Sequence, residues 1–134
     1  MTEKAARKIL IVEDDKFLSR LYSDQLRRDG FEVIVASSGV EGLGRATREL
    51  PDLVLLDIIL PDKNGFDVLS GLKLNKDTRN IPVLILSNLG GETDMKTGIS
   101  LGASGYLVKT DISITRLGEE VRRHLAAASA SGTR

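Results

Sequence analysis

The sequence predicts an α/β protein in which a five-stranded parallel sheet is covered by helices on both faces. Five short apolar runs alternate along the chain with segments of helical periodicity. Three of these runs, residues 9–12, 53–56 and 83–86, are continuous stretches of Ile, Val and Leu, typical of strands buried on both faces. Strict alternation of strands and helices favours right-handed crossovers and therefore a parallel sheet.

The remaining elements follow in chain order. Residues 31–36 contain a glutamate within the apolar run, which favours an edge strand, and residues 106–108 form the fifth strand. Four connections carry apolar residues at helical spacing. These residues are Leu18, Leu21, Tyr22 and Leu26; Val40, Leu43 and Leu50; Leu69 and Leu72; and Ile114, Leu117, Val121 and Leu125. Gly30 and Pro51 mark the ends of the first two helices.

The fourth connection, residues 90–102, differs from the others because it contains Gly90, Gly91, Gly98 and Gly102. A glycine inside a helix costs about 1 kcal/mol relative to alanine. We therefore expect a helix of marginal stability here, in a segment soft enough to be repositioned.

The length of 134 residues suits one domain. We expect a flavodoxin-like, doubly wound sheet of order 2-1-3-4-5 with five flanking helices. The expected boundaries are an N-terminal extension at 1–7, the domain at 8–126, and a flexible C-terminal tail at 127–134, where Ala, Ser and Gly dominate.

Composition excludes several classes of function. The chain has 19 basic and 19 acidic residues, so its net charge is zero, which argues against direct nucleic-acid binding. The absence of cysteine excludes disulfide scaffolds and thiolate metal sites, and the single histidine, His124, is expected to be an ordinary, partly exposed residue of the last helix. No apolar run has the length of a membrane span, and the first residues lack an apolar signal core, so we expect a cytoplasmic protein.

Polar residues stand directly after four of the predicted strands, where ligands bind in this architecture. Glu13 and Asp14 follow the first strand, Asp57 the third, Ser87 the fourth and Lys109 the fifth. Asp15, one place further on, is expected to cap the first helix.

Three carboxylates against one lysine leave two negative charges uncompensated, which destabilises the site unless a cation enters. Oxygen ligands without His or Cys favour Mg²⁺. An aspartate beside Mg²⁺ and a lysine suits nucleophilic attack on phosphorus, so Asp57 is the candidate nucleophile. Lys109 and Ser87 are placed to hold phosphoryl oxygens.

These residues, with their surrounding motifs, resemble the receiver domain of two-component response regulators, a chemotaxis-receiver-like family. The motifs are residues 9–15 (ILIVEDD), residues 55–65 (LLDIILPDKNG), Ser87, and residues 102–109 (GASGYLVK). The resemblance, carried by these four motifs in this order, extends over most of the chain, from about residue 8 to residue 125.

The resemblance implies a phosphorelay role for each matched position. Asp57 would accept the phosphoryl group, with Asp14 a direct Mg²⁺ ligand and Glu13 a ligand through water. The backbone carbonyl of Ile59 would be a further ligand, and Ser87 with Tyr106 would form the switch pair.

The resemblance also implies partners. A histidine kinase or phosphotransfer protein would supply the phosphoryl group, and acyl phosphates often can. The domain would assist its own phosphorylation and dephosphorylation rather than act as an enzyme. A downstream protein would bind the face formed by the fourth helix, fifth strand and fifth helix.

The sequence departs from the family where a cis proline usually follows the lysine. Thr110 stands there, and a non-proline cis bond costs about 2.5–4 kcal/mol, so a trans bond is expected.

Three other functions remain open at this stage. A small Mg²⁺-dependent phosphatase of the haloacid-dehalogenase type also uses an aspartate after a strand, but that family places a second acid where Ile59 stands. A flavodoxin-type binding module would need a phosphate loop after Val12. A degenerate receiver could act only as a scaffold.

Overall fold

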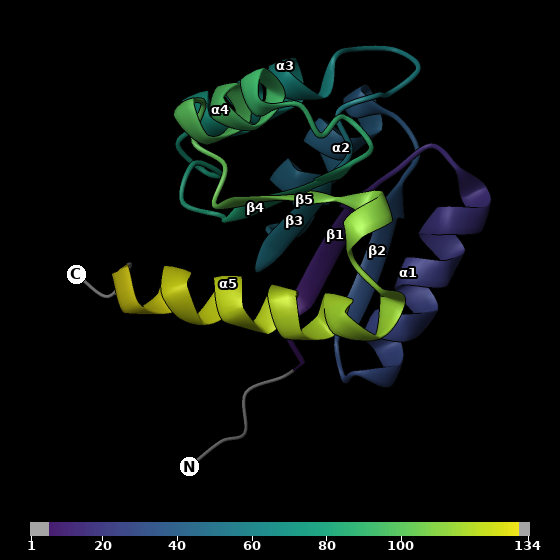
Figure 1. The fold of residues 1–134 in the computed structure, drawn as a ribbon. Coiled ribbons are helices and arrows are strands. Elements are labelled where there is room, and N and C mark those ends of the chain that lie inside the picture. Colours follow the sequence, from purple (N-terminus) through teal and green to yellow (C-terminus); the bar gives the residue numbers. More distant parts are fainter. Residues whose placement is uncertain (1–5, 132–134) are drawn as a thin grey trace.

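The computed structural model describes residues 6–131, and it confirms the predicted architecture (Figure 1). The strands are β1 (Lys8–Val12), β2 (Glu32–Ala36), β3 (Leu53–Leu56), β4 (Val83–Ser87) and β5 (Gly105–Val108). The helices are α1 (Lys16–Arg28), α2 (Gly39–Glu49), α3 (Gly65–Leu74), α4 (Glu92–Ser100) and α5 (Leu117–Ser131). The sheet is parallel with the order β2-β1-β3-β4-β5, so β2 is an edge strand as predicted.

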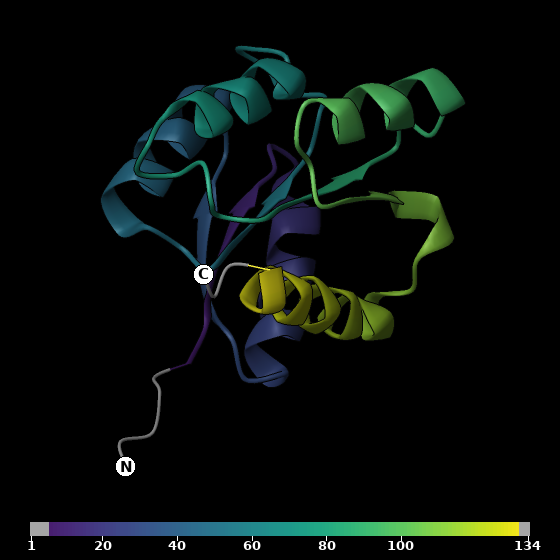
Figure 2. The same cartoon turned by 90° about the vertical axis from the view of Figure 1, so that its left-hand side faces the viewer.

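Helices cover both faces of the sheet. Figures 1 and 2 show α1 and α5 on one face and α2, α3 and α4 on the other. Alternate residues of β1 serve the two layers: Ile9 and Ile11 join the core beneath α1 and α5, whereas Leu10 and Val12 join the core beneath α2 and α3. This double burial explains why β1 has no polar alternation.

Two details at the C-terminal end differ from the sequence-based expectation. The segment predicted as the start of the last helix forms a 3₁₀ turn at Ile114–Arg116, and a second 3₁₀ turn covers Lys109–Asp111. The α-helix itself continues to Ser131, past the expected boundary at residue 126. Residues 132–134, and residues 1–5 of the expected extension at 1–7, lie outside the described residues, and the flexibility of the tail stays a prediction.

The fourth connection forms α4, which begins without a side-chain cap at Gly91. Gly98 is buried on the inner side of α4, and a Cβ there would lie 2.7 Å from Ile85 Cδ1 and 3.1 Å from Tyr106 Cδ2. The glycine therefore lets α4 approach β4 and β5 closely.

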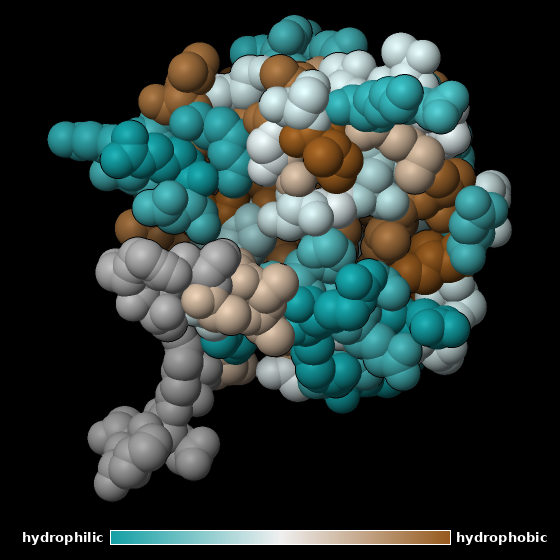
Figure 3. Space-filling model, turned by 60° about the vertical axis from the view of Figure 1, so that its left-hand side comes forward, coloured by the Kyte–Doolittle hydropathy of each residue, from teal (hydrophilic) through white to brown (hydrophobic). Residues whose placement is uncertain are grey.

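The surface of the described residues carries scattered apolar side chains. On the face shown in Figure 3, hydrophobic residues form separate groups among hydrophilic ones. The large exposed hydrophobic residues lie on different elements, for example Phe17 on α1, Leu74 on α3 and Ile99 on α4. Between residues 6 and 131, no helix combines the length and apolarity needed to cross a membrane.

Candidate functional site: an acidic cluster at the carboxyl edge of the sheet

Parallel strand ends bring the predicted site residues to one edge of the sheet. Glu13 directly follows β1, Asp57 follows β3, Ser87 ends β4 and Lys109 follows β5. The Asp57 amide donates to the Val12 carbonyl at 3.0 Å, which extends the sheet pairing by one residue and fixes the position of the Asp57 backbone. The prediction that these residues lie at one edge of the sheet is therefore confirmed.

Three carboxylates form a compact cluster. One oxygen each of Glu13, Asp14 and Asp57 lies within 4.8 Å of the others. Glu13 and Asp57 are 3% and 5% exposed, whereas Asp14 is open to solvent. The cluster is thus buried on the sheet side and accessible on the Asp14 side.

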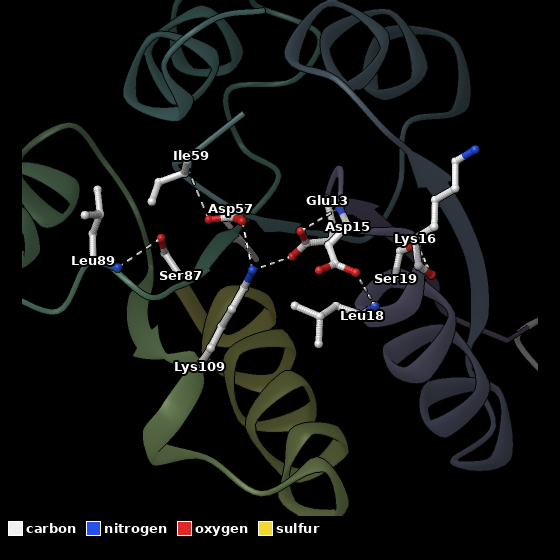
Figure 4. A network of polar contacts seen from close by, with 10 residues as sticks. All are labelled: Glu13, Asp15, Lys16, Leu18, Ser19, Asp57, Ile59, Ser87, Leu89 and Lys109. Atoms are coloured by element: carbon white, nitrogen blue, oxygen red, sulfur yellow. Dashed lines mark hydrogen bonds and ion pairs between the residues drawn. The ribbon is translucent and has the colours of Figure 1, made fainter. Parts of the chain in front are cut away.

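Lys109 lies between the two buried carboxylates, as Figure 4 shows. Its Nζ is 2.6 Å from Glu13 Oε1 and 2.9 Å from Asp57 Oδ2. The second oxygen of each carboxylate accepts a backbone amide: Asp15 N–H donates to Glu13 Oε2 at 3.1 Å, and Ile59 N–H donates to Asp57 Oδ1 at 3.2 Å. Both buried carboxylates therefore have fixed orientations.

The local environment shifts the pKa of two of these groups. Burial raises the pKa of Glu13 above its ordinary 4.5, although hydrogen bonds from Lys109 and the Asp15 amide act in the opposite direction. Burial alone would lower the pKa of Lys109, but its hydrogen bonds to Asp57 and Glu13 outweigh burial and raise that pKa above 10.5. Lys109 is therefore a permanent cation at neutral pH.

Ser87 and Tyr106 are linked through the backbone of Leu89. Ser87 is fully buried, and its Oγ accepts the Leu89 N–H at 3.3 Å (Figure 4). The Tyr106 hydroxyl donates to the Leu89 carbonyl. The segment after β4 is thus held between the two residues that the sequence singled out as a switch pair.

Ile59 presents its backbone, rather than its side chain, to the site. Its amide bonds Asp57, while the side chain is 55% exposed. A tight turn supports this segment: the Gly65 amide donates to the Ile58 carbonyl at 2.8 Å, and a Cβ on Gly65 would lie 2.4 Å from Ile58 Cα. Whether the Ile59 carbonyl is a metal ligand stays a prediction.

Three smaller predictions can also be compared with the structure. Asp15 caps α1, because its Oδ1 accepts the Leu18 amide at 3.0 Å. The Lys109–Thr110 bond is trans, as expected from the missing proline. His124 lies half-buried on α5 against Gly105, away from the acidic cluster and consistent with an ordinary packing role.

Sequence reasoning gave no role to Asp62, whereas the buried Tyr22 belongs to the apolar set predicted for the first helix. Asp62 accepts two backbone amides of α2, and Tyr22 is buried in the core beside α5. A carboxylate directly after Pro61 was the available signal for Asp62, but its partner could not be read from the sequence.

The donor set fits a hard divalent cation. Carboxylate oxygens of Glu13, Asp14 and Asp57, with no nitrogen or sulfur donor among them, are the ligands that Mg²⁺ prefers. The uncompensated negative charge of the cluster favours the same ion. The donor set and the charge of the cluster therefore fit a site for a divalent metal ion.

Comparison with known proteins places the chain in a family. The profile of the response regulator receiver domain matches residues 9–122. Transcriptional regulatory protein CpxR of Escherichia coli K12 is 42% identical over 102 residues, which cover 76% of this chain and 42% of CpxR. Response regulator PleD of Caulobacter vibrioides is 39% identical over 102 residues, covering 76% of this chain and 22% of PleD. The chain thus spans less than half the length of these curated relatives.

Solved structures agree with this assignment. The BeF3-activated N-terminal receiver domain of Klebsiella pneumoniae RstA is 33% identical, with a TM-score of 0.80 over 88% of this chain and 97% of that one. A CheY-like receiver domain protein of Methanospirillum hungatei JF-1 is 26% identical, with a TM-score of 0.86 over 96% of this chain and 100% of that one. From its sequence, fold and acidic cluster, the chain belongs to the response regulator receiver domain family of two-component signalling.

Proposed function

We propose that this receiver domain accepts a phosphoryl group on Asp57 in an Mg²⁺-dependent reaction. The observation that carries the proposal is the setting of Asp57, which is 5% exposed, lies in the three-carboxylate cluster and contacts the Lys109 ammonium at 2.9 Å. A carboxylate held in this way has a fixed orientation and a cation beside it.

Glu13, Asp14 and Asp57, together with the Ile59 carbonyl, would hold the metal. Asp14 is open to solvent and suits a direct ligand, whereas Glu13 is already bonded to Lys109 and the Asp15 amide, which favours contact through water. When bound, Mg²⁺ neutralises charge on the phosphoryl oxygens.

In the transfer step, an Asp57 carboxylate oxygen attacks phosphorus and the bond from phosphorus to the donor breaks. The donor is the phosphohistidine of a histidine kinase or phosphotransfer protein, or a small acyl phosphate. Lys109 is placed to pair with a phosphoryl oxygen, and the Ser87 hydroxyl to donate to another after it leaves the Leu89 amide. Attack of water on phosphorus later restores the carboxylate, so the domain dephosphorylates itself.

Phosphorylation would be transmitted through Ser87, Leu89 and Tyr106. The phosphoryl group brings a charge of about −1.5 to −2 and new hydrogen-bond acceptors. Movement of Ser87 toward it would release the Leu89 amide, and Tyr106 would respond because its hydroxyl bonds the same residue. Tyr106 also packs on Gly98 of α4, so this helix would shift with the ring.

The partner face would be formed by α4, β5 and α5. A groove of about 330 Å³ lies on this face, and its lining includes Met95, Tyr106, Val108, Ile112 and Glu120. Because Tyr106 lines the groove, movement of its ring would change the groove's shape. We infer a downstream protein as the occupant, with signalling in the cytoplasm and no direct contact to nucleic acid by this domain.

The complete acidic set supports phosphoacceptance over a scaffold role, and the apolar Ile59 side chain disfavours the phosphatase alternative. The test is incubation with Mg²⁺ and acetyl phosphate, followed by intact-protein mass spectrometry. We expect one added phosphoryl group on the wild type and on the control Asp77→Asn, an exposed loop residue, and none on Asp57→Asn. Equal phosphorylation of Asp57→Asn would overturn the proposal.

A further inference from the structure

Asp62 joins the segment after β3 to the start of α2. Its Oδ1 accepts the Gly39 amide at 2.8 Å and its Oδ2 accepts the Val40 amide at 2.9 Å. These two donors belong to the first turn of α2, where amides have no partner within the helix. They lower the pKa of Asp62, so the carboxylate is ionised at neutral pH and both bonds are charge-assisted.

A second contact supports the same junction. A Cβ on Gly39 would lie 2.5 Å from Lys63 Cγ, so the stem of Lys63 rests directly on the start of α2. Asp62 and Lys63 therefore fasten the middle of the segment between Ile59 and Asn64. Its two ends are fixed separately, by the Ile59 amide on Asp57 and by Asn64 Oδ1, which accepts the Phe66 amide at 2.8 Å.

We propose that Asp62 is a positioning residue, which holds the segment carrying the Ile59 carbonyl and thereby sets how tightly the acidic cluster binds Mg²⁺. This inference rests on the proposed function, in which that carbonyl is a ligand. Ile59, Pro61 and Asp62 are exposed, and between them only the half-buried Leu60 packs against the core, so packing orders this segment weakly. Without the tether, metal binding has to order the segment, and the lost conformational entropy weakens affinity.

Asp62 acts through the backbone and not as a ligand. Among residues 6–131, the carboxylates that gather within ligand distance of one another are Glu13, Asp14 and Asp57. Both oxygens of Asp62 already accept amides of α2. Its effect therefore differs from that of a neighbouring negative charge that merely attracts a cation.

Glu41, which lies on α2 itself, provides a matched control. Its Oε1 accepts the Ser37 amide at 2.8 Å, so it also stabilises the start of α2, but it makes this bond to the residue before the α2 N-cap rather than to the segment after β3. Glu41→Ala removes a carboxylate and a hydrogen bond of comparable kind. It leaves the Asp62 tether in place.

The experiment measures Mg²⁺ affinity from backbone amide shifts in NMR titrations of the wild type, Asp62→Ala, Asp62→Asn and Glu41→Ala. We expect affinity to fall about tenfold in Asp62→Ala, less in Asp62→Asn, which keeps one acceptor oxygen, and to stay unchanged in Glu41→Ala. Unchanged affinity in Asp62→Ala, or an equal loss in Glu41→Ala, would overturn the inference.

Amide hydrogen exchange of the metal-free proteins tests the tether independently of the metal. Exchange at Ile59 should be faster in Asp62→Ala than in the wild type and Glu41→Ala, and equal rates would overturn the positioning role. Failure of the wild type to bind Mg²⁺ would instead overturn the proposed function. The two failures are therefore distinguishable.

Discussion

The ammonium of Lys109 lies between two buried carboxylates that repel each other, at 2.6 Å from Glu13 and 2.9 Å from Asp57. Burial of a charge is tolerated where partners and hydrogen bonds replace water. In the absence of a metal, Lys109 thus stabilises the buried carboxylates of the site. Its stabilising effect is present at neutral pH and is lost only as pH rises through its raised pKa, above 10.5.

Replacing Lys109 with methionine should reveal this stabilising role. Lys109→Met leaves Glu13 and Asp57 without their common partner, so the free energy of unfolding should fall by about 3 kcal/mol. Saturating Mg²⁺ should restore part of the loss, since binding to the folded state alone is stabilising. Urea denaturation with and without Mg²⁺ measures both effects. The exposed Lys76→Met is the control, and a loss as small as in that variant would contradict the argument.

Replacing Asp14 should have the opposite effect on the metal-free protein. Asp14 adds an exposed negative charge within 4.8 Å of the other two carboxylates, so Asp14→Asn should raise the free energy of unfolding by about 1 kcal/mol. In the proposed function the same change removes a ligand, so the increase in melting temperature that Mg²⁺ is expected to give the wild type should disappear. Thermal melts with Mg²⁺ and with EDTA test this. A full Mg²⁺ response in Asp14→Asn would show that Asp14 is not a ligand.

Among the elements, α4 depends for its stability on close packing against the sheet, because its glycine lowers its intrinsic helix propensity. Gly98 lowers the intrinsic stability of α4 but leaves room for Ile85 and the Tyr106 ring. α4 packs on β5 at the buried Gly98, and Gly91 begins the helix without a side-chain cap. A helix that rests on the Tyr106 ring through Gly98 is suited to follow a movement of that ring.

Two glycine-to-alanine substitutions separate propensity from packing. A Cβ on Gly44 of α2 would meet only the mobile end of Arg48 at 3.3 Å, so Gly44→Ala should stabilise by about 1 kcal/mol. A Cβ on Gly98 would lie 2.7 Å from Ile85 Cδ1, and overpacking of this kind costs about 1–3 kcal/mol. Gly98→Ala should therefore bring no gain or a loss in urea denaturation. Stabilisation equal to that of Gly44→Ala would show that the space between α4 and the sheet accommodates a Cβ at position 98.

Elements buried on both faces were the easiest to predict from the sequence. β3 matches its apolar run residue for residue, and β4 extends one residue further, to Ser87. The polar residues at the strand ends followed from the topology, because parallel strands end at the same edge. The Asp62 contact to Gly39 could not be predicted, since it depends on how a loop and a helix 23 residues apart are placed in space. The 3₁₀ turn at Ile114–Arg116 was missed because its apolar spacing also suits a helix.

At the scale of the whole molecule, the sheet separates two hydrophobic cores. The site lies at the carboxyl edge of the sheet, directly after strand residues that belong to these cores. The core beneath α1 and α5 includes Ile11 and Leu55, and the core beneath α2 and α3 includes Val12 and Leu56. Glu13 and Asp57 follow directly on these residues, so packing on both faces fixes the positions of the site carboxylates. α5 covers the sheet edge through His124, which lies over Gly105 of β5: a Cβ there would be 2.5 Å from His124 Cε1.

The pH dependence of stability should therefore report the docking of α5. Burial lowers the pKa of His124 below its ordinary 6.5, with Arg123 acting in the same direction and Glu120 in the opposite one. The unfolded chain then binds the proton more readily than the folded chain. The contribution of the buried, neutral His124 to stability is therefore complete above pH 6.5 and declines as pH falls from 6.5 toward the lowered pKa.

The raised pKa of Glu13 has the opposite effect on stability above pH 4.5, so the pH dependence of the wild type alone does not isolate His124. The difference between the wild type and His124→Gln, followed by urea denaturation from pH 8 to pH 5, isolates His124. We expect the wild type to lose stability relative to the variant on acidification, and a pH-independent difference would mean that α5 does not bury the imidazole.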